Sequence, residues 1–233
     1  MTMTERTPKH IAFIPDGNRR WAKSQGLPSL EGHRSGYDRF KDAARWCLDR
    51  GVKEITFWGF STENWKRSEE EVSYLMNLLL NALTKDLKAF AGEEFQLHVI
   101  GRREGLSEAL LKAIDTAEAS TAQNTKGRIN LCINYGGGPD ILQMAQQAAK
   151  TSEEVTEEWV SNHLWTAGMS KPDIIVRTSG EQRLSGFLPW LGGYSELYFP
   201  ACAWPAFSKD ELTEILDWYE GGERRFGGDT KKA

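Results

Sequence analysis

The sequence alternates short apolar runs with longer amphipathic segments along most of its length. The short runs have the length of strands and are rich in β-branched and aromatic residues, and such alternation is typical of βαβ units around a parallel sheet. We therefore expect an α/β fold: a single domain with a central, mostly parallel sheet of about six strands, surrounded by helices. The expected strands are residues 10–14, 54–60, 95–100, 128–133, 173–176 and 196–199.

Helical patterns fill the segments between these strands. Residues 36–50 place their apolar side chains on one helical face. Ser68 with Glu71 has the spacing of a capping box and predicts a helix that runs to about residue 90. Ser208 with Glu211 predicts another helix, to about residue 220.

No Pro-rich, Gly/Ser-rich or single-charge run divides the chain. A length of 233 residues suits one sizeable α/β domain, because two small domains would need a visible seam between them. We expect one domain over residues 10–228, with short, polar and flexible ends at 1–9 and 229–233.

Composition excludes several classes of protein. The formal net charge of −4 argues against a nucleic-acid partner, which usually requires a basic face. The three cysteines, Cys47, Cys132 and Cys202, are widely spaced in apolar surroundings and are expected to be reduced core residues. No apolar run approaches the length of a membrane span and the first ten residues are polar, so we expect a cytoplasmic protein that touches a membrane surface at most.

Polar and charged residues concentrate directly after the expected strands. Because the carboxyl ends of parallel strands meet at one edge of a sheet, these segments should converge there, where such folds bind their ligands. They carry a carboxylate, several arginines, glycine-rich turns and tryptophans. The segments are residues 15–21, 61–67, 134–138 and 177–183.

The chemistry of these segments suits a phosphate-bearing ligand. Guanidinium groups bind two phosphate oxygens at once, and Arg19, Arg20, Arg67, Arg177 and Arg183 could supply such contacts. The sequence contains neither a P-loop nor a strand-linked Gly-x-Gly-x-x-Gly fingerprint, so nucleotide cofactors have no positive support. Diphosphates without a nucleotide fit better.

Asp16 is the candidate metal ligand. Mg²⁺ is often held by one or two protein carboxylates together with substrate phosphates. The alternative is that Asp16 only shapes a turn, since Asp-Gly is a common turn dipeptide. Zinc chemistry has no support, because none of the four histidines has ligand spacing with another histidine or with a cysteine pair.

The segment from Val72 to Leu83 is apolar over more than one helical stripe, so it should be buried on more than one side. Core packing alone would explain this pattern. The alternative is that part of the helix lines a slot for a long hydrocarbon, with Trp58 and Phe60 of the preceding strand completing the wall.

Taken in order, these segments resemble the cis-prenyltransferases, in particular the bacterial undecaprenyl diphosphate synthases. The resemblance covers about residues 10–228, nearly the whole chain. It rests on the blocks HIAFIPDGNRRWA, GHRSG, FWGFSTENWKR, INYGGG, DIIVRTSGEQRLSGFLPW, YSELYF and ERRFGG.

This resemblance implies a magnesium-dependent catalytic domain that works as a homodimer. It would condense an allylic diphosphate such as farnesyl diphosphate with isopentenyl diphosphate units into a Z-polyprenyl diphosphate, undecaprenyl-like in length. A long product would bring the enzyme into transient contact with a membrane surface.

The family pattern also implies roles for individual residues. Asp16 and Asn64 would be catalytic: Asp16 would hold Mg²⁺, and Asn64 would assist removal of a proton from isopentenyl diphosphate. Glu196 would complete the metal environment across the dimer interface. The implied substrate-binding residues are Gly17, Asn18, Arg19, Arg20, Trp21, His33 and Arg67 for the allylic diphosphate, Ser61, Thr62, Glu63 and Trp65 beside it, Arg177, Arg183 and Ser185 for isopentenyl diphosphate, and Arg225 and Gly227 from a neighbouring subunit.

Several positions depart from the commonest bacterial pattern. Pro15 replaces a Met, Ser29 an Arg and Glu31 an aromatic residue; Gly138 replaces an Arg and Gly186 an Asn, while Gln182 stands where some members have a His. These positions bear on the choice of allylic substrate and on product length.

Two alternatives on the same scaffold follow from the sequence. The first is a short-chain or irregular prenyl diphosphate synthase. The second is a noncatalytic partner subunit, although such subunits typically lose the residue equivalent to Asp16 or the loop arginines, and this chain has both.

Overall fold

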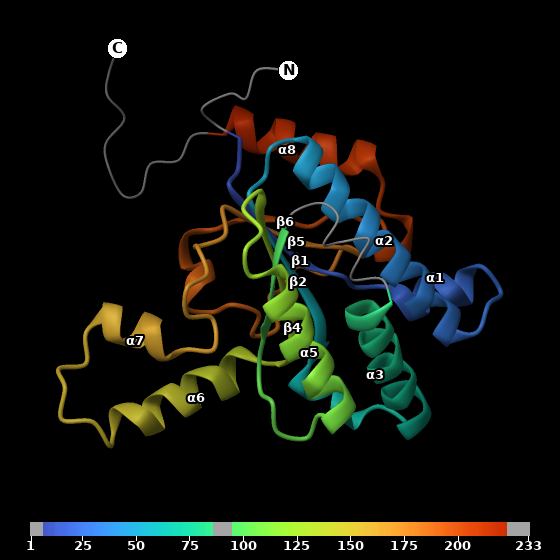
Figure 1. The fold of residues 1–233 in the computed structure, drawn as a ribbon. Helices are drawn as coiled ribbons and strands as arrows, with labels where there is room; N and C mark the ends of the chain where they lie inside the picture. Colours follow the sequence, from blue (N-terminus) through green and yellow to red (C-terminus); the bar gives the residue numbers. More distant parts are fainter. Residues whose placement is uncertain (1–6, 86–94, 223–233) are drawn as a thin grey trace, which may run out of the picture.

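The computed structural model describes residues 7–85 and 95–222. Their strands form one six-stranded sheet in the order β3-β4-β2-β1-β5-β6, and every pairing in it is parallel. This confirms the expected α/β fold (Figure 1). The strands are β1 (His10–Ile14), β2 (Glu54–Ser61), β3 (Phe95–Ile100), β4 (Gly127–Tyr135), β5 (Ile174–Arg177) and β6 (Glu196–Tyr198).

Helices and 3-10 turns connect the strands. The α-helices are α1 (Asn18–Ser24), α2 (Ser29–Asp49), α3 (Glu69–Thr84), α5 (Glu108–Thr121), α6 (Gly137–Ala148), α7 (Glu157–His163) and α8 (Lys209–Gly221). The 3-10 turns are η1 (Thr62–Lys66), η2 (Leu191–Tyr194) and η3 (Trp204–Ala206).

The start of one helix differs from the sequence pattern. Helix α2 begins at Ser29, seven residues before the expected start at residue 36, because Pro28 stands directly before its first turn and needs no N–H partner there. Ser68 caps α3 as expected, accepting a hydrogen bond from the Glu71 backbone N–H. The expected end of this helix, at about residue 90, lies outside the described residues, which stop at Lys85 and resume at residue 95.

Each face of the sheet has its own apolar core, because successive side chains of a strand point to opposite faces. In β1, Ile11 and Phe13 join the larger core, whereas Ala12 and Ile14 join the smaller one. Buried residues of α2, α3, α5 and α8 complete the larger core, so these helices cover one face of the sheet. The smaller core is closed by Phe187, Leu188 and Leu191.

A β-bulge at Gly59 changes which side chains of β2 face α3. The register with β4 shifts between Trp58 and Phe60, so Gly59 has no partner in the ladder. Phe57 and Gly59 face α3 by the ordinary alternation of a strand, and the bulge turns Phe60 to the same core as Phe57. Trp58 faces the opposite side and stacks on Phe187 at 4.9 Å between ring centroids. The expectation that Trp58 walls a slot beneath α3 is therefore wrong, because its ring belongs to the other core.

Burial confirms two of the three cysteine assignments. Cys47 and Cys132 are fully buried, and burial raises the pKa of both thiols far above the ordinary value. Cys202 is only half-buried, and burial together with Glu211 raises its pKa to about 11. None of the described helices is long and apolar enough to span a bilayer.

The connection between β4 and β5 places the carboxyl ends of β1 and β5 side by side. From β1 the chain continues to β2 on one side, whereas β4 is followed by β5 on the other side of β1. A crevice forms at such a switch point, because the two connections leave the sheet in opposite directions. The segments after β1 and β5 therefore frame the candidate site.

Trp204 provides a test of the larger core. Its ring is 2% exposed, stacks on Phe207 and donates a hydrogen bond to the Gly36 carbonyl. We expect Trp204→Ala to lower the free energy of unfolding by about 3 to 5 kcal/mol, measured by urea denaturation. The matched control is Trp218→Ala, since Trp218 is 42% exposed and should cost less than about 1 kcal/mol. Equal losses would show that Trp204 does not anchor the core.

Candidate active site

Asp16 lies at the centre of the candidate site, directly after β1. Its Oδ2 accepts a hydrogen bond from Arg177 at 2.9 Å, and its Oδ1 accepts from Gly17 N at 2.6 Å and from Arg20 at 3.2 Å. Burial works to raise the pKa of Asp16, but the hydrogen bond and charge of Arg177, with help from Gly17 and Arg20, hold it below its usual value. The carboxylate is therefore charged at neutral pH.

Gly17 allows the chain to turn sharply beside this carboxylate. Its φ of +96° lies in the region that favours glycine, and a Cβ at this position would come within 2.6 Å of Ser179 Oγ and 2.9 Å of Ala203 Cβ. The segment after β1 thus packs directly against the segment after β5. Only a residue without a side chain permits this approach.

Arg177 is a buried arginine at the end of β5, with 8% of its side chain exposed. Besides Asp16, its guanidinium contacts the Arg183 carbonyl at 2.6 Å and Ser185 Oγ at 2.8 Å. Ser185 has a φ of +52°, so the loop that carries it bends back toward the sheet. Arg177 therefore joins Asp16 to the loop that carries Arg183 and Ser185.

Glu181 links arginines from the two sides of this site. Its carboxylate pairs with Arg20 at 2.7 Å and with Arg183 at 2.6 Å. Hydrogen bonds from Arg183 and Arg20 lower the pKa of Glu181, so it is ionised at neutral pH. More than half of each of these two arginine side chains remains exposed, so an incoming anion can reach both.

A second cluster of charges lies around Glu71, on the first turn of α3. His33 Nε2 and Arg67 Nη1 both lie 2.9 Å from Glu71 Oε1, and Arg19 Nη1 lies 3.5 Å from Oε2. Burial lowers the pKa of His33 below its ordinary value, although the hydrogen bond to Glu71 works against that shift. Burial raises the pKa of Glu71, but His33, Arg67 and Arg19 outweigh it and leave that pKa lowered.

The η1 turn after β2 is held by reciprocal hydrogen bonds. Ser61 N–H donates to Asn64 Oδ1 at 3.1 Å, and the Ser61 side chain accepts from the Asn64 backbone. Asn64 therefore uses its side-chain oxygen within the turn. Thr62 donates to Glu63 at 3.0 Å, and Trp65 donates from its indole N–H to Asn134 at 2.8 Å.

A polar cleft of about 300 Å³ brings together eight of the expected site residues. Its wall includes the residues that follow β1, a histidine from α2, an arginine that follows η1, and charged residues from the segment after β5. The lining residues are Pro15, Asp16, Gly17, Asn18, Arg19, Arg20, His33, Arg67, Glu181 and Arg183.

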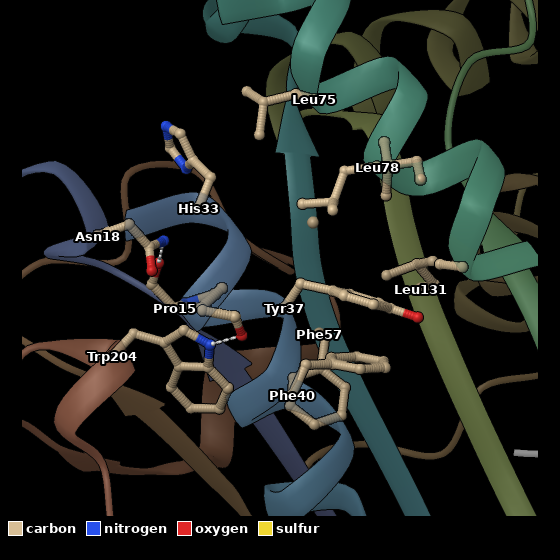
Figure 2. A pocket seen from close by; sticks show the side chains of 14 residues that line it. Pro15, Asn18, His33, Tyr37, Phe40, Phe57, Leu75, Leu78, Leu131 and Trp204 are labelled. Atoms are coloured by element: carbon tan, nitrogen blue, oxygen red, sulfur yellow. Dashed lines mark hydrogen bonds between the residues drawn. The ribbon is translucent and has the colours of Figure 1, made fainter. Parts of the chain in front are cut away.

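An apolar cavity of about 100 Å³ lies next to the cleft (Figure 2). Pro15, Asn18 and His33 line both spaces. Leu75 and Leu78 of α3 approach the cavity from one side and Phe57 of β2 from another, as Figure 2 shows. Part of the apolar face of α3 thus lines a cavity, while Phe60 is a core residue that does not line it.

Some expected site residues lie elsewhere. Glu196 begins β6 and pairs with Ile174 at the amino end of β5, so within one chain it lies at the opposite edge of the sheet from Asp16. Trp21 is half-buried on α1 and is not part of the cleft wall. Arg225 and Gly227 fall outside the described residues.

The site also contains residues that the sequence did not single out for it. Glu71 was interpreted only as a capping partner, yet its carboxylate contacts His33, Arg67 and Arg19. Nothing in the sequence pointed to Glu181 except its position between Arg177 and Arg183. Trp204 comes from a distant segment and borders the apolar cavity.

Asp16 can supply one ligand position to Mg²⁺. A carboxylate offers about four lone-pair positions, and the donors from Gly17, Arg20 and Arg177 use three of those on Asp16, so one remains for a cation. Over residues 7–85 and 95–222, no three His, Cys, Asp or Glu side chains gather to form a complete metal site. Such a donor set fits an ion that takes most of its ligands from substrate phosphates.

Comparison with known proteins identifies the family. Residues 14–227 match the family model described as putative undecaprenyl diphosphate synthase. The chain belongs to this family. Two curated members with the name isoprenyl transferase, from Lactococcus lactis and Thermotoga maritima, are 44% and 40% identical and match 96% of the chain; the matches cover 95% and 98% of those proteins.

Solved structures of the family share the fold. Lavandulyl diphosphate synthase from Lavandula x intermedia, crystallised with dimethylallyl diphosphate, is 34% identical with a TM-score of 0.91 over 96% of this chain and all of that chain. A probable undecaprenyl diphosphate synthase from Campylobacter jejuni is 28% identical with a TM-score of 0.80, over 94% of this chain and 98% of that chain. The resemblance inferred from the sequence blocks is confirmed.

Gly17 provides a test of the close approach beside Asp16. We expect Gly17→Ala to destabilise the protein by about 1 to 2 kcal/mol for its positive φ and by more for the contact with Ser179, measured by urea denaturation. Gly26→Ala is the control, because Gly26 also has a positive φ (+69°) but a Cβ there would meet nothing within 4 Å. The two variants should differ; identical losses would mean that the contact with Ser179 relaxes freely.

Proposed function

We propose that this protein is a cis-prenyltransferase that condenses an allylic diphosphate, in the first instance farnesyl diphosphate, with isopentenyl diphosphate. The observation that carries the proposal is the adjacency of two spaces: an arginine-lined cleft around Asp16 shares Pro15, Asn18 and His33 with an apolar cavity beside α3. A prenyl diphosphate has the same two parts, an anionic head and a hydrocarbon tail.

The allylic diphosphate is assigned to the side of the cleft formed by Asp16, Gly17, Asn18, Arg19 and Arg20, with His33 and Arg67 opposite and Trp21 adjacent. Bond cleavage at the allylic carbon leaves negative charge on the departing diphosphate. Cationic groups placed in advance around that charge lower the barrier, because they need no reorganisation during the reaction. Arg19, Arg20 and Arg67 meet this requirement.

Isopentenyl diphosphate is assigned to the side formed by Arg177, Arg183 and Ser185. This diphosphate is not broken, so the protein only has to hold it in register with the allylic carbon. Arg183 is exposed and can exchange Glu181 for a phosphate oxygen. Ser185 is fixed by Arg177, and the η1 residues Ser61, Thr62, Glu63 and Trp65 would border the reacting carbons.

Each condensation forms one carbon–carbon bond, expels one diphosphate and releases one proton from isopentenyl diphosphate. Asn64 would direct its amide N–H groups at a substrate oxygen, because its own oxygen is engaged by Ser61. A neutral amide is a poor base. The proton is therefore assigned to a diphosphate oxygen, with Asn64 orienting the pair.

We include Mg²⁺ as the cofactor, held by Asp16 and by substrate oxygens. When bound, it would supply positive charge to the diphosphate. Glu196 of a second copy would complete its surroundings in a homodimer, since Glu196 lies far from Asp16 within one chain. Arg225 and Gly227 are assigned to the same interface.

For the product, we propose an undecaprenyl-like Z-polyprenyl diphosphate, which would bring the enzyme into transient contact with a membrane surface. Burial of the growing prenyl tail contributes about 0.8 kcal/mol per methylene. An apolar cavity next to the cleft therefore favours elongation of the prenyl chain. A short-chain or irregular coupling enzyme is the second candidate, because the lavandulyl diphosphate synthase is 34% identical over nearly the whole chain. A noncatalytic subunit is disfavoured by the intact cluster of Asp16 and its arginines.

The test is an incubation of purified protein with isopentenyl diphosphate and Mg²⁺ in the presence of dimethylallyl, geranyl or farnesyl diphosphate. Mass spectrometry of the products should show a ladder that ends at a long Z-prenyl chain. A single short or branched product would favour the second candidate. Absence of any coupled product with all three primers would refute the proposal.

Asp16→Ala provides the mutational test. We expect kcat to fall by about two to three orders of magnitude while KM for the allylic diphosphate changes much less, because Asp16 acts mainly as the leaving group departs. The control is Asp115→Ala, which removes an exposed carboxylate of α5 and should leave both constants unchanged. Near-normal turnover of Asp16→Ala would show that the metal assignment is wrong.

A further inference from the structure

Glu71 is a buried carboxylate that the proposed reaction does not use. Only 11% of its side chain is exposed, and His33, Arg67 and Arg19 all contact it. These three partners come from separate segments: α2, the residue that follows η1, and α1. A buried carboxylate is costly unless it is paired and hydrogen-bonded, so this arrangement is specific.

Helix capping does not account for the position of this carboxylate. In a capping box, the Glu side chain would return to the backbone N–H of the cap residue Ser68. The Glu71 backbone N–H does bond to Ser68 Oγ at 3.3 Å, but the Glu71 carboxylate hydrogen-bonds instead with His33 and Arg67. The helix is capped by Ser68 alone, and the carboxylate has a separate task.

The three partners of Glu71 all line the polar cleft, whereas Glu71 itself is not part of the cleft wall. Each partner gives only part of its donor capacity to Glu71: a guanidinium has five N–H donors and an imidazole has two ring nitrogens. Donors therefore remain for a ligand in the cleft. Glu71 thus holds these three side chains from outside the cleft wall.

We propose that Glu71 is a positioning residue for the allylic diphosphate: it holds Arg19, His33 and Arg67 in one arrangement that matches the diphosphate head. This inference rests on the proposed function for the identity of the ligand. Because Glu71 belongs to the first turn of α3, the same contacts also hold the helix that lines the apolar cavity. One carboxylate thereby sets the distance between the head and tail sites.

A simpler explanation is that Glu71 is only a counter-charge that keeps Arg19 and Arg67 from repelling each other. The two explanations predict opposite signs. Loss of a counter-charge leaves the cleft more positive, so anions should bind more tightly. Loss of a positioning group lets the arginines and His33 adopt other rotamers, so a diphosphate should bind more weakly.

The experiment uses Glu71→Gln, which keeps the size of the side chain and removes its charge. Calorimetry with inorganic pyrophosphate measures the head site directly and requires no turnover. We expect about tenfold weaker binding, the factor that corresponds to about 1.4 kcal/mol. Glu70→Gln is the matched control, because Glu70 is an exposed carboxylate on the same turn and its loss should leave binding unchanged.

Steady-state kinetics separate positioning from a general structural effect. In Glu71→Gln, KM for the allylic diphosphate should rise about tenfold, while KM for isopentenyl diphosphate stays within about twofold. A damaged fold would alter both constants and would lower the melting temperature. Binding of pyrophosphate as tight as in the wild type, or tighter, would overturn the proposal.

A second variant covers the case in which Glu71→Gln does not fold. Glu71→Asp keeps the charge but shortens the side chain by one methylene. Positioning predicts weaker pyrophosphate binding, whereas a counter-charge role predicts binding like that of the wild type. The proposed function fails separately: a wild-type protein that binds pyrophosphate but couples no primer would refute the reaction and leave the role of Glu71 in holding a diphosphate intact.

Discussion

The contact between Asp16 and Arg177 is the interaction on which the site depends. It joins the carboxyl ends of β1 and β5, which become neighbours only because the chain crosses to the other side of the sheet after β4. Arg177 is buried, and removal of one partner of a buried ion pair leaves an uncompensated charge. The pair therefore serves two purposes: it closes the crevice at the switch point and keeps a charged carboxylate where a diphosphate can approach.

From this pair, opposite charges alternate across the cleft. Arg177, Asp16, Arg20, Glu181 and Arg183 follow one another through contacts of 2.6 to 3.2 Å. Arg20 and Arg183 are more than half exposed, so exchanging their partner Glu181 for a diphosphate costs little desolvation. Arg177 stays buried beneath them. This order of burial separates the group that builds the site from the groups that capture ligands.

The sequence predicted the strands and the convergence of the loops because both follow from local patterns. A run of buried residues shows its own period, and parallel strands always bring their carboxyl ends to one edge. Trp58 was assigned to the wrong core because successive side chains of β2 alternate: Phe57 faces the larger core, so Trp58 faces the smaller one. The bulge at Gly59 then returns Phe60 to the side of Phe57. Glu71 and Glu181 were missed as site residues because their partners lie far away in sequence or on the same short loop, where charge alone has no pattern.

The departures from the bacterial pattern lie around the site, not within its central pair. Gly138 has open space around it, and Gly186 has a φ of +83° at a position where a Cβ would meet nothing within 4 Å. Ser29 begins α2 and is exposed, while Glu31 on the same turn lies 4.0 Å from Arg34. None of these residues contacts Asp16 or Arg177 in the described part of the chain. Variation at these positions therefore leaves the contact between Asp16 and Arg177 in place.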